Sequence, residues 1–125
     1  MGTDEVPAPE EEPDRPGFFR GRQIWTYMED VRHLIQTRRL DEAETLLNGI
    51  LDAEELFSRA SNTALYPDFY NRLMWVYRRK HDLLAERNLL RRYAAQRRAH
   101  SRLEKQMLIR LGELEALEDN ISSCD

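Results

Sequence analysis

The sequence predicts an all-α fold in which two antiparallel helical hairpins stack and a further helix caps them. Apolar residues recur at three- and four-residue steps over most of the 125-residue chain, whereas strand signals are weak. One pattern also occurs twice, in residues 38–57 and 80–93, and its two Ala-Glu pairs lie 42 residues apart. Since a helical hairpin cannot bury its apolar stripe alone, we expect the two copies to stack on each other.

Residues 1–17 are predicted to form a disordered acidic tail. They hold four of the five prolines, six acidic residues and one arginine, and they show no helical period. The aromatic pair Phe18-Phe19 follows, and we expect it to pack on the first hairpin, with an exposed docking motif as the alternative. A single helical domain is therefore predicted over residues 18–121, with residues 122–125 as a short polar tail.

The first hairpin is predicted from two amphipathic stretches. Residues 22–38 are expected to form a helix because Ile24 and later apolar residues recur at helical spacing. A second helix is expected to begin near Asp41, since Asp41 and Glu44 have the spacing of a capping box. Gly49 lies inside this second helix, where glycine costs about 1 kcal/mol relative to alanine. We interpret it as a point of close approach by another helix.

The second hairpin is predicted after a loop over residues 61–66. Pro67 suits the first position of a helix over about residues 67–80. Asp82 is a favourable N-cap for the helix that follows. Both stretches carry apolar residues at helical spacing, so each is expected to bury one face.

A break near residues 99–101 and a fifth helix over about residues 102–119 are predicted next. The stretch before the break holds few large apolar side chains, and Ser101 with Glu104 has the spacing of another capping box. One uninterrupted helix over residues 83–119 is the alternative, although it would be unusually long for a small domain.

The fifth helix carries an apolar stripe that needs a partner surface. Its members are Leu103, Met107, Leu111, Leu114 and Leu117. One interpretation is that the stripe covers the exposed face of the second hairpin, since terminal repeats need such a cover. The other is a homodimer seam, because the spacing is that of a short coiled coil.

Basic residues are concentrated in one block. The net charge of the chain is −4, but residues 72–110 hold twelve basic and three acidic residues, a net charge of +9. Arginine accounts for 17 of the 19 basic residues, and it makes bidentate contacts with carboxylates and phosphates. Three interpretations are open: a solvated face neutralised by the acidic segments, a surface for an acidic protein partner, and a nucleic-acid-binding surface.

Motifs of catalysis or cofactor binding are absent from the sequence. There is no glycine-rich phosphate loop, nucleophile elbow, H-E-x-x-H or C-x-x-C, and Cys124 is the single cysteine. The three histidines are far apart, and carboxylate pairs such as Glu54-Glu55 are interpreted as solvated helix faces. We therefore expect no catalytic, cofactor-binding or metal-binding residues. Because the sequence shows no targeting signal or membrane span, a cytoplasmic location is expected.

The two copies resemble tetratricopeptide-like (TPR-like) repeats over about residues 24–57 and 66–99. In the first copy the pattern positions are Tyr27, Val31, Leu34, Arg38, Leu40, Ala43 and Leu47. In the second copy they are Phe69, Leu73, Val76, Lys80, Ala85 and Leu89. The chain departs from the family in its 42-residue period, in lacking the closing proline and in holding larger residues where small ones are usual. The resemblance implies stacked hairpins, protein or peptide binding on a concave face, and no catalytic residues.

The predicted function is that of a small protein–protein interaction adaptor. Its partner segment is expected to be acidic and to bind in a groove lined by arginines and aromatic side chains. The candidate binding residues are Arg72, Arg79, Arg87, Arg91, Tyr70, Trp75 and Tyr77. A nucleic-acid-associated regulator that uses the same arginines and a self-assembling structural subunit are the alternatives.

Overall fold

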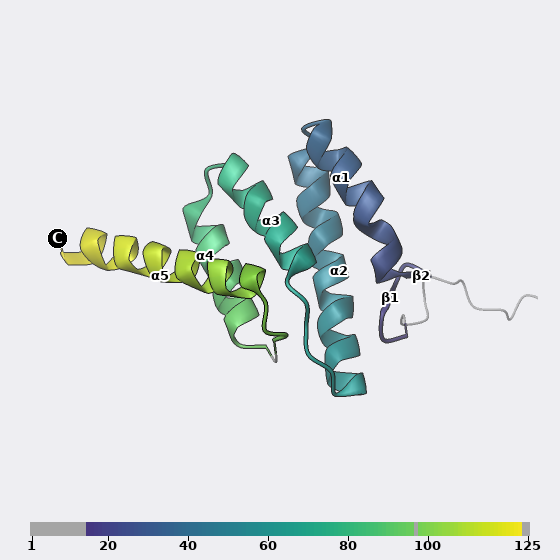
Figure 1. Ribbon diagram of the computed structural model, residues 1–125. Coiled ribbons are helices and arrows are strands. Elements are labelled where there is room, and N and C mark those ends of the chain that lie inside the picture. Colours follow the sequence, from purple (N-terminus) through teal and green to yellow (C-terminus); the bar gives the residue numbers. More distant parts are fainter. Residues whose placement is uncertain (1–14, 97, 124–125) are drawn as a thin grey trace, which may run out of the picture.

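The computed structural model describes residues 15–96 and 98–123 (Figure 1). Its elements are β1 (Phe18–Phe19), β2 (Arg22–Gln23), the 3₁₀ helix η3 (Ile24–Tyr27), α1 (Met28–Gln36), α2 (Leu40–Ser61), α3 (Asp68–Arg79), α4 (Leu83–Ala94) and α5 (Arg102–Ser123). The prediction of a mostly helical fold is confirmed. Of the predicted tail only residues 15–17 are described, and Gly17 is buried against Phe57. The rest of that tail, and residues 124 and 125, lie outside the described residues.

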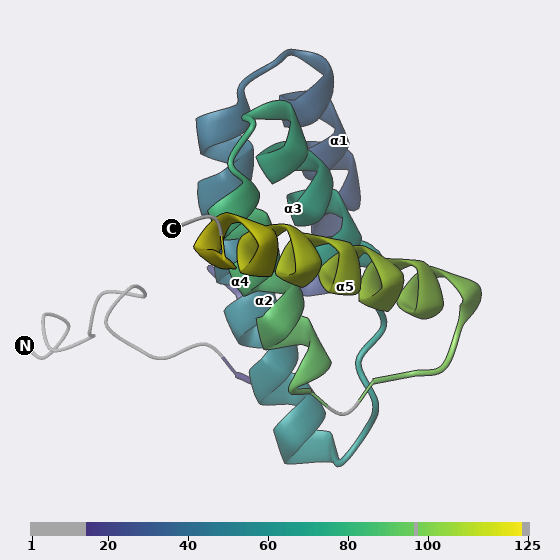
Figure 2. The ribbon, with the colours of Figure 1, turned by 90° about the vertical axis from the view of Figure 1, so that its left-hand side faces the viewer.

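The five helices pack in the order in which they follow one another along the chain. α1 and α2 run side by side in opposite directions, and α3 and α4 do the same beside them (Figure 1). The two hairpins meet through α2 and α3. α5 lies across α4, and its far end extends beyond the other helices (Figures 1 and 2).

A short β-hairpin precedes the helices, where a helix from residue 22 was predicted. Its antiparallel register pairs Phe18 with Gln23. The turn between the strands places Arg20 and Gly21 at φ values of 52° and 80°, a left-handed conformation that a helix cannot contain. The predicted start of the first helix is therefore wrong, because this turn commits the segment to a hairpin, and the chain becomes helical only from η3 onward.

Phe19 accounts for the glycine inside α2. Its ring lies so close to Gly49 that a Cβ atom there would be 2.2 Å from Phe19 Cζ. Phe19 also packs against Tyr27, whose hydroxyl donates to the Phe19 carbonyl at 2.7 Å. A close approach at Gly49 is therefore present, but the neighbour is an aromatic ring and not another helix.

The predicted helix starts agree with the structure in part. The Asp82 carboxylate caps α4 as predicted, accepting a hydrogen bond from the Ala85 N–H at 3.0 Å. The capping box predicted at Asp41 and Glu44 is wrong, because both carboxylates bind the Lys80 ammonium, at 2.7 and 2.6 Å. These ion pairs join the start of α2 to the end of α3 in place of a local cap.

The predicted break between the last two helices is confirmed. α4 ends at Ala94 and α5 begins at Arg102, so the single long helix is not formed. The connecting chain is tied to the loop before α3, since the Ala99 N–H donates to the Leu65 carbonyl at 2.7 Å. Pro67, at the end of that loop, is the N-cap of α3, one position before the helical position that was predicted for it.

The capping box predicted at the start of α5 is half formed. The Ser101 hydroxyl accepts a hydrogen bond from the Glu104 N–H at 3.0 Å. The buried Glu104 carboxylate binds Arg98 at 2.9 Å instead of closing the box. Glu104 thereby joins α5 to the segment that precedes it.

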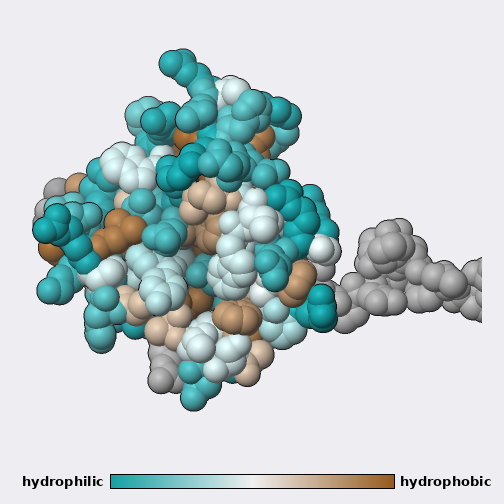
Figure 3. Space-filling view, turned by 45° about the vertical axis from the view of Figure 1, so that its right-hand side comes forward, coloured by the Kyte–Doolittle hydropathy of each residue, from teal (hydrophilic) through white to brown (hydrophobic). Residues whose placement is uncertain are grey.

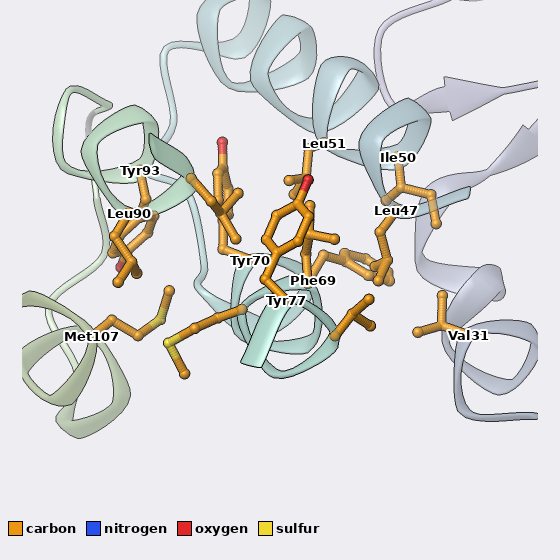
Figure 4. Packing of buried hydrophobic residues seen from close by; sticks show 14 of the residues in the cluster. Val31, Leu47, Ile50, Leu51, Phe69, Tyr70, Tyr77, Leu90, Tyr93 and Met107 are labelled. Carbon is orange, nitrogen blue, oxygen red and sulfur yellow. The ribbon is translucent and has the colours of Figure 1, made fainter. Parts of the chain in front are cut away.

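One core runs through the whole stack (Figure 4). Its buried side chains, taken from α1 to α5, include Val31, Leu47, Tyr70, Leu90 and Met107. The face of the molecule in Figure 3 is mainly hydrophilic, with hydrophobic residues in small patches. Within the described ranges, no helix has the length and apolar character needed to cross a membrane.

The apolar stripe of α5 packs within its own chain. Met107, Leu111 and Leu114 are buried, and Leu103 packs at the edge of the core. Leu117, the last predicted member, is half exposed. This packing supports the interpretation that α5 covers the second hairpin, whereas a homodimer through the same residues would require α5 to leave α4.

Candidate functional site

The three aromatic residues predicted for a binding groove divide into core and surface. Tyr70 is fully buried, and its hydroxyl donates to the Glu55 carboxylate. Tyr77 is buried as well and donates to Glu44 at 3.1 Å. Tyr70 and Tyr77 are seven residues apart, which is about two helical turns, so both lie on the face of α3 that packs on α2. The prediction is thus corrected: of the three, Trp75 alone, at 47% exposure, lies at the surface.

Two of the four predicted arginines hold α5 onto α4. Arg87 forms an ion pair with Glu118. Arg91 binds Glu115 at 2.8 Å and Glu118 at 3.3 Å. Because α5 already matches their charges, Arg87 and Arg91 do not form the free basic groove that the sequence predicted.

Further arginines of the basic block bind carboxylates between helices. Arg92 of α4 binds Glu55 of α2 at 2.6 Å. Arg110 of α5 binds Glu86 of α4 at 2.9 Å. Glu86 is fully buried and also lies 3.6 Å from Arg78 of α3, so one carboxylate joins three helices. These arginines are partly buried and bind carboxylates of α2 and α4, so they do not form the solvated face neutralised by the acidic segments that was one interpretation of the sequence.

Arg72 and Arg79 differ from the other arginines of the block. Neither forms a salt bridge with any residue that the structure describes. Both lie on the same side of α3 as Trp75, because steps of three and four residues return to one face of a helix. Arg78 extends over the Trp75 ring, 4.5 Å from its centroid. We call Arg72, Trp75, Arg78 and Arg79 the α3 surface.

A cavity of about 310 Å³ lies between η3, the end of α2 and the loop before α3. Trp25, Phe57 and Tyr66 form part of its wall, and Glu54 lines it from α2. Glu54 is 5% exposed, and its Oε1 atom is buried with no hydrogen-bond partner among the described residues. Burial, and after it the charge of Asp68, raises the pKa of Glu54 to about 8.

This cavity was missed by the sequence analysis. The interpretation of Glu54-Glu55 as a solvated face is wrong, because both side chains are buried. The apolar stripe of α2 contains the signal that was overlooked. Leu47 and Ile50 are buried, and position 54 is the next step of the same stripe, so a glutamate there falls on the buried face.

Neither a metal centre nor a relative assigns the function. The described residues contain no group of three or more histidine, cysteine or acidic side chains that could hold a metal ion. Comparison with known protein families, with curated proteins and with solved structures found no match. The α3 surface and the cavity are therefore the two features from which a function can be argued.

Proposed function

We propose that the protein is a small helical interaction adaptor that binds an acidic segment of a partner protein through the α3 surface. The observation that carries this proposal is the exposed Trp75 between Arg72 and Arg79, both of which lack an acidic partner in the described part of the chain. Tryptophan and arginine are the side chains that most often dominate the energy of protein interfaces. Arginine also binds carboxylates with two parallel hydrogen bonds.

The stacked hairpins support the same role. TPR-like repeats, which the sequence resembles, bind proteins or peptides on a concave face, and consecutive helices of this chain are stacked. Binding of nucleic acid is supported less well, because most of the arginines that would have to face phosphates already bind carboxylates. These are six of the ten arginines in residues 72–110, namely Arg78, Arg87, Arg91, Arg92, Arg98 and Arg110.

The test reverses the charge of the α3 surface. The full chain and its Arg72→Glu/Arg79→Glu variant are immobilised and exposed to native lysate with and without nuclease treatment. A protein captured under both conditions is then purified, and its affinity for each chain is measured by calorimetry. We expect a captured protein with an acidic segment to bind the variant at least about tenfold more weakly, because like charges replace opposite ones.

The matched control is the Arg59→Glu/Arg102→Glu variant. It makes the same change of net charge at two exposed arginines that form no salt bridge within the described residues. This control should bind the partner as the unmodified chain does. Equal binding by a folded Arg72→Glu/Arg79→Glu variant would reject the α3 surface, and capture that disappears with nuclease would favour a nucleic-acid-associated role.

A further inference from the structure

The cavity beside η3 has exposed aromatic side chains at its opening. Trp25 is 49% exposed and Tyr66 is 66% exposed, although large aromatic residues are usually buried. Trp25 is held in place by Phe57, since the two rings meet edge to face at a centroid distance of 5.4 Å. Exposed aromatic groups beside a concave, mostly apolar site are typical of ligand-binding sites.

Glu54 lines this cavity, and its side chain is buried. Its Oε1 atom has no donor among the described residues, and a buried acceptor without a partner is costly. Its neighbour Glu55 shows how the same chain neutralises a buried carboxylate, since Arg92 binds it at 2.6 Å. The missing donor at Glu54 can therefore be supplied by a ligand.

We infer that this cavity binds an alkylammonium group, with the ammonium donating to the Glu54 carboxylate and its alkyl chain lying among Trp25, Phe57 and Tyr66. Aromatic faces attract organic cations by their quadrupole, and the attraction strengthens where water is excluded. A single oxygen without a partner in the described part of the chain suits the compact charge of an ammonium better than the planar fork of a guanidinium, which prefers two acceptors. The ligand has the opposite charge to that expected at the α3 surface, so this site does not rest on the adaptor role.

The electrostatic surroundings of Glu54 favour a cation. The titratable groups that interact with it are Glu55 of α2, Asp68 and Tyr70 of α3, and Tyr93 of α4. Both acidic neighbours raise the pKa of Glu54, whereas the Tyr66 backbone N–H lowers it. A bound ammonium stabilises the ionised carboxylate and so opposes the effect of the acidic neighbours. The affinity for the ammonium should therefore rise as the pH rises through about 8.

The experiment titrates the full chain with n-butylammonium, with Nα-acetyl-lysine methylamide and with neutral n-butanol, followed by amide and indole NMR shifts. Both cations should cause saturable shifts at Trp25 and Tyr66. Their Kd should fall about tenfold between pH 7 and pH 9, because the ionised fraction of a group with a pKa of about 8 rises from about 0.09 to about 0.9. Tighter binding of the lysine derivative would indicate a lysine of a partner as the ligand, and equal binding a free amine.

Variants separate the carboxylate from the apolar wall. Glu54→Gln keeps the shape of the side chain and should weaken both cations at least about tenfold at pH 9. Glu42→Gln removes an exposed carboxylate from the same helix and should change nothing. Trp25→Leu, which leaves Glu54 in place, should also weaken binding of both cations. It tests the same site if Glu54→Gln does not fold. Equal shifts with n-butanol, or undiminished cation binding by either folded variant, would overturn the inference.

Discussion

Glu54 in α2 and Glu86 in α4 are both buried carboxylates, and their surroundings differ in charge. Glu86 accepts hydrogen bonds from Arg110 at 2.9 and 3.2 Å and lies 3.6 Å from Arg78. The Oε1 atom of Glu54 has no hydrogen-bond partner among the described residues, and Asp68 lies close enough to raise the pKa of Glu54. The difference indicates two uses of a buried carboxylate in one small fold. Glu86 joins helices, whereas Glu54 lines a cavity and has a carboxylate oxygen without a partner among the described residues.

Removing Glu86 tests whether a buried carboxylate with ion-pair partners stabilises the fold, and we expect it to cause the largest change in the free energy of unfolding. Glu86→Ala leaves the Arg110 guanidinium partly buried without its main counter-ion and opens a void between α4 and α5. Breaking a buried ion pair in this way typically costs about 3–5 kcal/mol. Urea unfolding followed by circular dichroism measures the loss, and Glu42→Ala, at an exposed site, should change the free energy of unfolding by less than about 1 kcal/mol. A similar small change at Glu86 would mean that it does not hold the helices together.

Removing the charge of Glu54 should increase the free energy of unfolding, in contrast to Glu86→Ala, and the size of the increase should depend on pH. The folded-state pKa of about 8 lies above the ordinary 4.5, so the folded chain holds this proton more tightly than the unfolded chain does. The stability contributed by that proton is complete below about pH 4.5 and is lost as the pH rises through about 8. Glu54→Gln cannot suffer this loss, and at pH 9 it should be more stable than the unmodified chain by on the order of a few kcal/mol.

The measurement is the urea midpoint of both chains at pH 5 and pH 9. At pH 5 the two free energies of unfolding should agree within about 1 kcal/mol, because Glu54 is protonated in the folded state and only partly ionised in the unfolded state. A Gln variant that is less stable than the unmodified chain at both pH values would instead place a cationic or donor partner at Glu54.

The fold could be predicted from the sequence where local patterns decide structure. Apolar periodicity located the helices, and the Asp82 cap lies within four residues of the N–H that it binds. The patterns failed where distant groups decide. Asp41 and Glu44 have the spacing of a capping box, yet Lys80 binds both from α3. The turn at Arg20 and Gly21 places Arg22 and Gln23, the first two residues of the predicted helix, in a hairpin with Phe18 and Phe19.

The candidate sites were harder to predict, because identical residue types have different partners in space. Arg79 and Arg91 both stand in basic stretches of amphipathic helices, but α5 brings two carboxylates to Arg91 and none to Arg79 within the described residues. Sequence spacing assigns a residue to a helix face and does not say which element covers that face. The tertiary arrangement of α5 was needed to separate the two arginines.

The smallest expected change in the free energy of unfolding concerns the arginines of α3 and α4. Arg87→Ala/Arg91→Ala removes three ion pairs between α4 and α5, leaves the Arg110–Glu86 pair in place, and should cost about 1.5 kcal/mol, since pairs near the surface contribute about 0.5 kcal/mol each. Arg72→Ala/Arg79→Ala removes no ion pair within the described residues and should cost less than about 0.5 kcal/mol. Urea unfolding at low salt and at 1 M NaCl measures the free energy of unfolding of both variants. Because salt screens ion pairs near the surface, the difference between the variants should be smaller at 1 M NaCl. Amide exchange along α5 should accelerate in the first variant alone. Equal losses of unfolding free energy in the two variants would mean that Arg87 and Arg91 contribute no more to stability than Arg72 and Arg79 do. A difference between the variants that salt leaves unchanged would mean that Arg87 and Arg91 act through packing and not through charge.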